Sequence, residues 1–405
     1  MALSKDKLQK GLDLFATLWI ILSTGSLTLC IFNMKFTMFV LLGIAFVYII
    51  LHPQIGRKQF NTLLGVLGMV LLNSILNIKF LELNSDIVIL LIQLFSIAII
   101  TSNITRKTFT TNYCRVLFWL CILSLVCFLT SEIGISLPGT REIWFKNKFY
   151  IYTFYHTLGR WYIFHRNAGI FWESPAFAIF INIAVAFVLL ADVSIPPKKR
   201  MVYFIVYSIT LFSTLAITGY IEFFLVLMAI VFQKRNRKTF QKEKEEKSTR
   251  YLVGLVVFVV IVVFLVRENS THMIRDKIVH RQGSFSERSN DTLQAIRIGL
   301  ERPLTGFGLF NTYTDKALNA VNVTDNSNSF SAMLMYLGIP FFLAYSWQFL
   351  WGIRQYFNSS IVSILFLCGT FIVFLNSEQI AKMTLFLFFL FPLCSGNEEK
   401  PHKII

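Results

Sequence analysis

The sequence is poor in charged residues, and acidic residues are the scarcer kind. Asp, Glu, Lys and Arg make up 15% of its 405 residues, with 22 acidic against 38 basic side chains. The six cysteines form no Cys-x-x-Cys pair, which argues against a disulfide framework or a zinc site. Segments of about ten residues with alternating hydrophobicity are absent as well, which excludes a membrane β-barrel.

Long apolar runs dominate the sequence instead. Hydrophobic residues make up 55% of the chain, and its mean hydropathy is +0.62. A helix needs about 17–25 apolar residues to cross a bilayer core of ~30 Å, and about 12 runs are of this kind. They are 12–33, 36–52, 60–78, 86–103, 116–136, 169–193, 201–217, 219–233, 251–266, 329–350, 358–376 and 379–395. The sequence therefore predicts an all-α, polytopic membrane protein that forms a single integral membrane domain over residues 1–405.

Basic residues are unevenly distributed among the short loops, which predicts an orientation. They gather at Lys5, Lys7, Lys10, Arg57, Lys58, Arg106, Lys107, Arg115, Lys198, Lys199, Arg200 and in the run 234–250. Cytoplasmic loops carry an excess of Lys and Arg, so we expect these loops and both termini in the cytoplasm. The net charge of +16 then reflects orientation, and we expect no nucleic-acid partner. The first apolar run lacks a small-residue cleavage site, so we expect it to remain as a span.

Two long loops, about 137–168 and 267–328, are left on the outer face, and both are rich in Arg and Lys. Basic residues there have no orienting role. They either form solvated faces balanced by nearby acidic residues or bind an anion at the membrane surface, and we favour the anion site.

The second loop is predicted to contain two short helices. Thr271 can cap a stretch that stops at Gly283, and Asn290 or Asp291 can cap the next helix. In that helix the apolar residues Leu293, Ile296 and Leu300 share one face. Pro303 stops it, and Gly306 and Gly308 allow a tight turn or a close backbone approach.

Polar residues also stand at the ends of apolar runs. In RNAGIFWESPAF (166–177), Arg166 lies at the expected interface, where a guanidinium can bind a phosphate bidentately. Glu173 lies about two turns into the predicted span and would cost about 2.5–3.5 kcal/mol facing lipid at mid-bilayer, so we expect it to face a cavity or an arginine. The alternative is a snorkelling arginine and a structural ion pair. Glu222, near an outer hairpin, can line the same cavity, whereas Glu378 and Lys382 are spaced to pair along a helix.

Two further blocks carry a family resemblance. In SFSERSNDTLQAIRIGLERPLTGFGLF (284–310), Arg288 is followed by a Pro-x-x-Gly-x-Gly motif, and SNSFSAMLMYLG (327–338) begins with an Asn-Ser-aromatic motif. With Arg166 at the entry to a span, this pattern resembles the O-antigen polymerase and ligase superfamily. The ligases, and some of the polymerases, have His before the Asn-Ser pair, whereas this sequence has Ser327 there. The resemblance therefore favours a Wzy-type polymerase.

The resemblance implies a glycosyltransferase of the bacterial inner membrane. It would polymerise undecaprenyl-pyrophosphate-linked oligosaccharide repeat units into O-antigen or capsular polysaccharide at the periplasmic face. The expected catalytic residues are Arg166, Arg288, Glu173 and Asp325, the two arginines holding the pyrophosphate. The expected substrate-binding residues are Arg281, Arg297, Arg302, Gly306, Gly308, Asn326, Asn328 and Glu222.

The same resemblance sets the expected partners and the alternatives. The partners are the lipid-linked donor and acceptor and membrane lipid, and a chain-length regulator is a further candidate. No Asp-x-Asp motif stands out in the outer loops, so we expect no metal and no cofactor. The alternatives are an O-antigen ligase and a lipid-linked oligosaccharide flippase, although a flippase should show two related halves.

Overall fold

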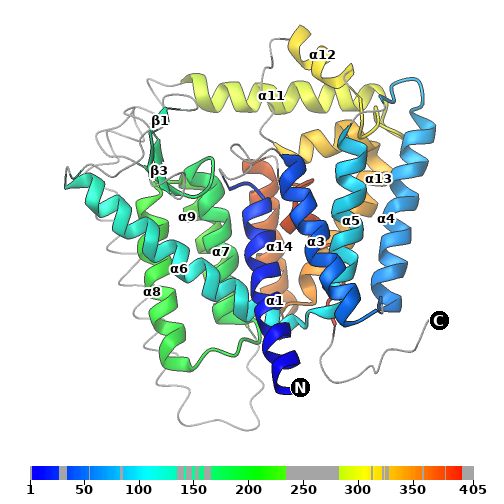
Figure 1. Ribbon diagram of the computed structural model, residues 1–405. Coiled ribbons are helices and arrows are strands. Elements are labelled where there is room, and N and C mark those ends of the chain that lie inside the picture. The colour runs from blue at the N-terminus through cyan, green and yellow to red at the C-terminus, as the bar shows by residue number, and fades with distance from the viewer. Residues whose placement is uncertain are drawn as a thin grey trace.

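The computed structural model is mostly helical (Figure 1). It describes residues 2–26, 34–53, 55–82, 85–133, 135, 141–142, 148–150, 155–158, 166–233, 282–311, 313–321, 323, 328–357, 360–378 and 380–394. The helices are α1 (Ala2–Ser23), α3 (Met34–Leu51), α4 (Arg57–Leu76), α5 (Ser85–Asn103), α6 (Arg106–Glu132), α7 (Ser174–Leu190), α8 (Pro197–Ser213), α9 (Ile217–Val231), α11 (Gln282–Glu301), α12 (Tyr313–Ala320), α13 (Ser329–Arg354), α14 (Ile361–Ser377) and α15 (Thr384–Phe388).

Several helices are apolar enough to cross a membrane. Within the described residues, α4, α5, α6 and α13 have both the length and the hydropathy of a span, and four further apolar helices are shorter. These helices make the chain a membrane protein. Of the predicted spans, 251–266 lies outside the described residues, and the count of about 12 is not confirmed.

The predicted last span, 379–395, is not a continuous helix. Its α-helical part is only α15, five residues long. Most of its described residues are buried, although Lys382 is exposed. Its backbone has hydrogen-bond partners on distant elements: Ile380 N donates to Ser329 Oγ at 2.7 Å, and Leu385 N donates to Thr24 Oγ1 at 2.9 Å. Irregular backbone at membrane depth is tolerated where protein surrounds it, and this explains why an apolar sequence here did not become a regular helix.

The loops predicted to lie on one side of the membrane do meet at one end of the bundle. Gly56 N donates to Ser102 Oγ at 3.2 Å, and Lys107 Nζ lies 3.6 Å from Asp192 Oδ1. Arg106 N donates to Cys394 O at 3.4 Å, which brings the end of the described chain to the same place. The N-terminus lies at this end, and α11 and α12 lie across the opposite end, which we call the α11 face (Figure 1).

A small antiparallel sheet lies at the α11 face, where only helices and loops were expected. Its strands follow the order β1 (Arg141–Glu142), β2 (Lys148–Tyr150), β3 (Tyr155–Leu158) and β4 (Arg166–Gly169). Strand β4 leads into α7, so the sheet fixes the entry to that helix. The all-α prediction missed it because each strand has no more than four residues.

Helix α11 corrects the prediction for the second loop. It is one helix of 20 residues, which passes through Gly283 and through the predicted cap at Asn290. The predicted apolar stripe faces outward, with Leu293 and Leu300 55% and 52% exposed. The buried side consists of Ala295, Ile298 and Gly299, and a Cβ on Gly299 would lie 3.1 Å from Met335 Cα. Helix α11 therefore packs closely on α13 at Gly299, with a face other than the predicted one.

Residues 303–308 dock on α13 where that helix is kinked at Gly338 (φ 72°, ψ 173°). Ile339 N donates to Pro303 O at 2.7 Å. Phe307 N and Gly308 N donate in turn to carbonyls of α13 at 3.0 and 2.9 Å. The kink thus exposes backbone groups that the docked segment satisfies.

Helix α4 holds the same segment from its other side. The side-chain amides of Asn73 and Asn77 both donate to Thr305 O, at 2.8 and 2.9 Å. The segment 303–308 therefore joins two helices that are far apart in the sequence. It binds α4 through the carbonyl of Thr305 and α13 at the kink at Gly338.

Gly306→Ala should destabilise the protein. Gly306 has φ +61°, and a Cβ there would lie 2.5 Å from Tyr336 O and 2.6 Å from Gly338 N. The left-handed backbone alone costs an L-residue about 1–2 kcal/mol, and the clash with rigid backbone adds to it. The thermal midpoint of the detergent-solubilised protein, followed by size-exclusion fluorescence, should fall. Gly43→Ala, within α3 and with open space around it, is the control. It should raise the free energy of unfolding by about 0.5–1 kcal/mol and so leave the midpoint unchanged or higher. Equal midpoints for the two variants would contradict the docking role.

Candidate functional site

Arg166 begins β4 and reaches the turn between α8 and α9. Its side chain is half-buried, and Nε donates to Thr214 O at 3.3 Å. Leu215, the next residue of that turn, has a positive φ of 50°. The guanidinium also lies near enough to Tyr220 to act on its phenol electrostatically. Arg166 is therefore held in place at the α11 face and does not extend freely from the surface.

Glu173 lies at the start of α7 and not two turns inside a span as predicted. It is the N-cap residue, with extended φ/ψ of −142° and 158°, and the helix begins at Ser174. The sheet and the turn after β4 occupy the residues that the hydropathy pattern assigned to the helix. Its carboxylate is consequently partly exposed at the same face as Arg166.

Trp172, beside Glu173, connects α7 to the end of α14. Its indole Nε1 donates to Glu378 Oε2 at 3.3 Å, and Glu378 is only 5% exposed. Glu378 is the C-cap of α14, and its backbone carbonyl accepts from Ser329 Oγ at 2.6 Å. Sequence reasoning paired Glu378 with Lys382 along a helix, but the helix ends before either residue.

The Asn-Ser motif acts at the beginning of α13. Asn328 Oδ1 accepts from Phe330 N at 2.8 Å and from Ser331 N at 3.2 Å, so Asn328 is the N-cap. Its amide donates to Asn376 Oδ1 at 3.1 Å. The motif predicted to bind substrate therefore also ties the start of α13 to the end of α14.

Glu222 lies in α9 with no exposed surface. Its Oε2 accepts from Asn182 Nδ2 at 2.9 Å, whereas Oε1 has no hydrogen-bond partner among the described residues. Glu378 acts on it electrostatically, so two buried carboxyl groups from α9 and α14 lie close together. The expectation that Glu222 lines the same cavity as Glu173 stays a prediction, and Glu378 is a residue that sequence reasoning did not include in the site.

Helix α11 carries position 288 over the start of α13. Thr292 Oγ1 accepts from Asn328 Nδ2 at 3.3 Å. Residues four apart share one face of a helix, so position 288 lies one turn before Thr292 on the face toward α13. The side chain of Arg288, and all of Arg281, Asp325 and Asn326, lie outside the described residues.

The remaining predicted site residues lie elsewhere on the α11 face. Arg297 is exposed on α11, on the side away from position 288. The guanidinium carbon of Arg302 lies 4.8 Å from the ring centre of Phe80 and 5.8 Å from that of Phe307, a cation–π arrangement. Gly306 and Gly308 take part in the docking on α13. The structure thus does not place these four residues beside Arg166.

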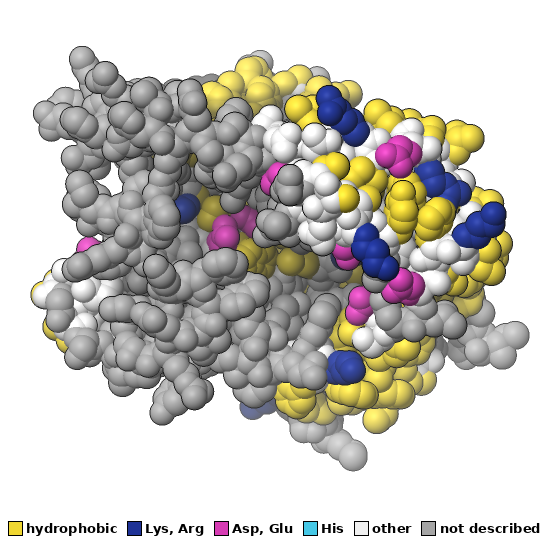
Figure 2. Space-filling model, turned by 90° about the horizontal axis from the view of Figure 1, so that it is seen from above, with side chains coloured by type: hydrophobic (Ala, Val, Ile, Leu, Met, Phe, Trp, Pro, Cys, Tyr) yellow, Lys and Arg dark blue, Asp and Glu magenta, His cyan; other side chains and the backbone are white. Residues whose placement is uncertain are grey.

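Seen from the α11 face, acidic side chains and a basic one lie beside apolar ones near the middle of the molecule (Figure 2). The described residues contain no group of three or more His, Cys, Asp or Glu side chains that could hold a metal ion. A fixed guanidinium can bind an anion, and a carboxylate at the same face can accept a proton from a hydroxyl.

Asn182→Ala should destabilise the protein by removing the hydrogen bond that Glu222 Oε2 accepts. Asn182 Nδ2 donates to Gly219 O as well as to Glu222 Oε2, both at 2.9 Å. A buried polar group that is left without its partner costs about 1–3 kcal/mol, so the thermal midpoint in detergent should fall clearly. Adding Glu222→Leu to Asn182→Ala should recover part of the loss, because an apolar side chain leaves no unpaired polar atom at this position. A single variant as stable as the wild type would show that this buried contact is unimportant.

Comparison with known proteins gives one match. The family model described as O-antigen ligase matches residues 202–346, which run from α8 to the middle of α13 and include the docked segment. No curated protein and no solved structure matches the chain. The match includes the blocks 284–310 and 327–338, whose motifs carry the resemblance, and over this part of the chain it confirms the resemblance to the O-antigen polymerase and ligase superfamily.

Proposed function

We propose that the protein is a polysaccharide polymerase. It joins lipid-pyrophosphate-linked oligosaccharide repeat units by glycosyl transfer on the α11 face, which faces the periplasm. The hydroxyl of an acceptor sugar attacks the anomeric carbon of the donor sugar. The bond between that carbon and the pyrophosphate breaks, and the lipid pyrophosphate leaves.

The observation that carries this proposal is the restrained position of Arg166. Its guanidinium is half-buried beside the turn after α8, at the same face as α11. A leaving pyrophosphate develops negative charge, and cationic groups already fixed in position stabilise it without reorganisation. Arg288, on the helix that covers this face, would supply the second guanidinium, and Arg fits phosphate oxygens bidentately.

A proton must also leave the attacking hydroxyl. Glu173 is the described candidate, because its carboxylate is partly exposed at the α11 face, one residue from Trp172. Asp325 is the second candidate, from the loop before α13. A general base must come within hydrogen-bond distance of the hydroxyl it deprotonates, and a position at the membrane surface permits this.

A ligase is the second candidate function, favoured by the description of the matched family model. The two reactions share the donor and differ in the acceptor, which is a second repeat unit for a polymerase and a lipid A-core for a ligase. Ser327 occupies the position where the ligases have His, and this supports the polymerase. We further propose that the protein resides in the bacterial inner membrane with both termini in the cytoplasm, where a chain-length regulator could act on it.

Arg166→Ala and Arg288→Ala should each abolish polymerisation. Purified protein would receive undecaprenyl-pyrophosphate repeat units with EDTA present, and the products would be resolved as a ladder. The wild type should make the ladder, and each variant should lose at least about 10²-fold in rate, the loss typical when one charge-stabilising donor is removed.

Lys316→Ala is the control for loss of charge, since Lys316 is an exposed cation on α12 at the same face. It should retain the ladder. A ladder retained in both arginine variants would reject the site, and transfer to lipid A-core without any ladder would replace the polymerase by the ligase.

A further inference from the structure

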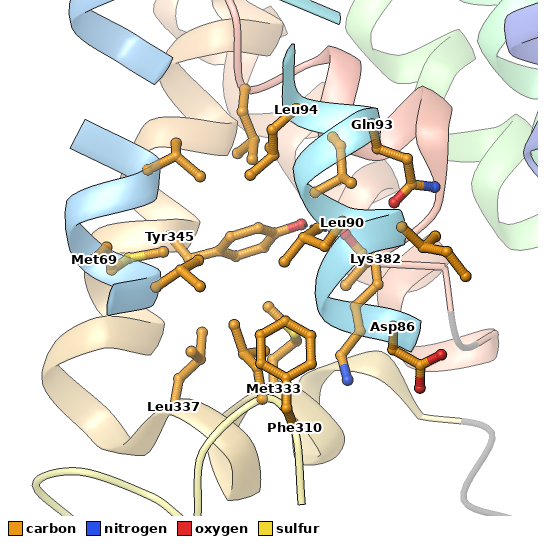
Figure 3. A pocket seen from close by; sticks show the side chains of 17 residues that line it. Met69, Asp86, Leu90, Gln93, Leu94, Phe310, Met333, Leu337, Tyr345 and Lys382 are labelled. Atoms are coloured by element: carbon orange, nitrogen blue, oxygen red, sulfur yellow. Dashed lines mark hydrogen bonds between the residues drawn. The ribbon is translucent and has the colours of Figure 1, made fainter. Parts of the chain in front are cut away.

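A cavity of about 260 Å³ lies between α4, α5, α13 and the buried segment 381–390. Its walls are mostly apolar and include Met69, Leu90, Met333 and Leu337 (Figure 3). Such a lining offers water few hydrogen-bond partners. The volume is also below the roughly 300–1,000 Å³ of pockets that enclose a whole small ligand, so the cavity suits one segment of a longer apolar molecule.

One end of this cavity carries charge. The side chain of Lys382 runs along the wall, and its amino group points to the end where Asp86 and Phe310 lie (Figure 3). That end is toward the α11 face, since Phe310 O accepts from Glu82 N at 2.9 Å just before α5 begins. The cavity is therefore amphipathic along its length, with an apolar body and a cation at the level of the membrane surface.

The charges around Lys382 leave its amino group able to bind an anion. Its Nζ lies 3.7 Å from the ring centre of Tyr336. Asp86 and Asp315 act on it electrostatically. Within the described parts of the chain, however, no carboxylate oxygen lies within 4.0 Å of it. A lysine ammonium binds phosphate as a point charge with three donors.

The cavity adjoins the proposed active site through the chain itself. Glu378, which accepts the hydrogen bond from Trp172, is four residues before Lys382. Glu378 thus contacts the entry to α7, and Ala381 and Lys382 line the cavity. A ligand whose head lies at Lys382 would be close to the proposed site of sugar transfer.

Polymerisation requires two lipid-linked substrates at once. The donor loses its pyrophosphate bond, so its pyrophosphate needs the strong stabilisation assigned to Arg166 and Arg288. The acceptor keeps its own pyrophosphate bond intact and needs only to be held. Each substrate also has a hydrocarbon chain that must lie within or against the membrane helices.

We infer that this cavity holds part of the polyprenyl chain of the acceptor substrate, with the Lys382 amino group at its pyrophosphate. The inference rests on the proposed polymerase function, because a ligase has an acceptor with a different lipid. The apolar walls bind the chain by excluding it from water, and the single cation binds the pyrophosphate without activating it as a leaving group.

The first test is photo-crosslinking of the full-length protein in nanodiscs. The probe is a polyprenyl pyrophosphate with a diazirine in its chain, and labelled peptides are mapped by mass spectrometry. We expect labels on α4, α5 and α13. Leu90→Trp fills the cavity and should reduce this labelling about tenfold, whereas Leu91→Trp, on the adjacent outward-facing position with Leu91 45% exposed, should leave it unchanged.

The second test separates the two substrates kinetically. A repeat unit blocked at its non-reducing end serves only as donor, and one with a non-cleavable phosphonate at its reducing end serves only as acceptor. Lys382→Gln should raise KM for the acceptor about tenfold with kcat and the donor KM nearly unchanged, and Lys382→Arg should restore it. The charge-bearing interaction contributes about this factor. Lys316→Gln is the matched control.

The outcomes are distinguishable. Equal labelling in Leu90→Trp and Leu91→Trp, or a rise in the donor KM instead of the acceptor KM, would overturn the inference. So would a diazirine phosphatidylglycerol that labels the cavity as strongly, because the cavity would then hold ordinary membrane lipid. A wild-type ladder with an unlabelled cavity would reject this site alone. A labelled cavity without any ladder would reject the polymerase and keep only the lipid site.

Discussion

The docking of residues 303–308 on the kink of α13 is the constraint on which the α11 face depends. Backbone groups freed at Gly338 form hydrogen bonds with Pro303 and with the residues that follow Gly306. Gly306 and Gly338 approach so closely that neither position has room for a Cβ atom. Buried backbone groups must be paired, so the kink and the docked segment require one another. Through Thr305 the same segment binds α4, and α11 ends directly before it.

This constraint positions the groups that the chemistry needs. With α11 held across the bundle, Thr292 of α11 contacts Asn328, whose side chain joins the start of α13 to the end of α14. Glu378 then links α14 to Trp172, next to the strand that holds Arg166. The proposed donor site and the cavity at Lys382 are consequently connected through the short stretch of chain between Glu378 and Lys382. A reaction that joins two lipid-linked molecules requires two such adjacent positions in a membrane.

Hydropathy and apolar periodicity predicted a helical membrane protein, because long apolar runs are what membrane-spanning helices require. They failed where long-range contacts decided the backbone. Residues 380–394 stay largely irregular because Ser329 and Thr24 accept hydrogen bonds from their backbone N–H groups, and α11 buries Ala295 and Ile298 while Leu293 is exposed. Motif resemblance put Arg166 and Arg288 forward as site residues, which stays a prediction, and it did not include Glu378. An acidic residue between two apolar runs was the signal that could have identified it.

The central claim is that a lipid pyrophosphate is held between the strand entering α7 and helix α11. The most direct measurement is a cryo-electron microscopy structure of the protein in nanodiscs with undecaprenyl pyrophosphate bound. The account predicts density for the two phosphates between the guanidinium groups of Arg166 and Arg288, at the α11 face. Phosphate density at the opposite end of the bundle, among Arg57, Arg106 and Lys107, would contradict it.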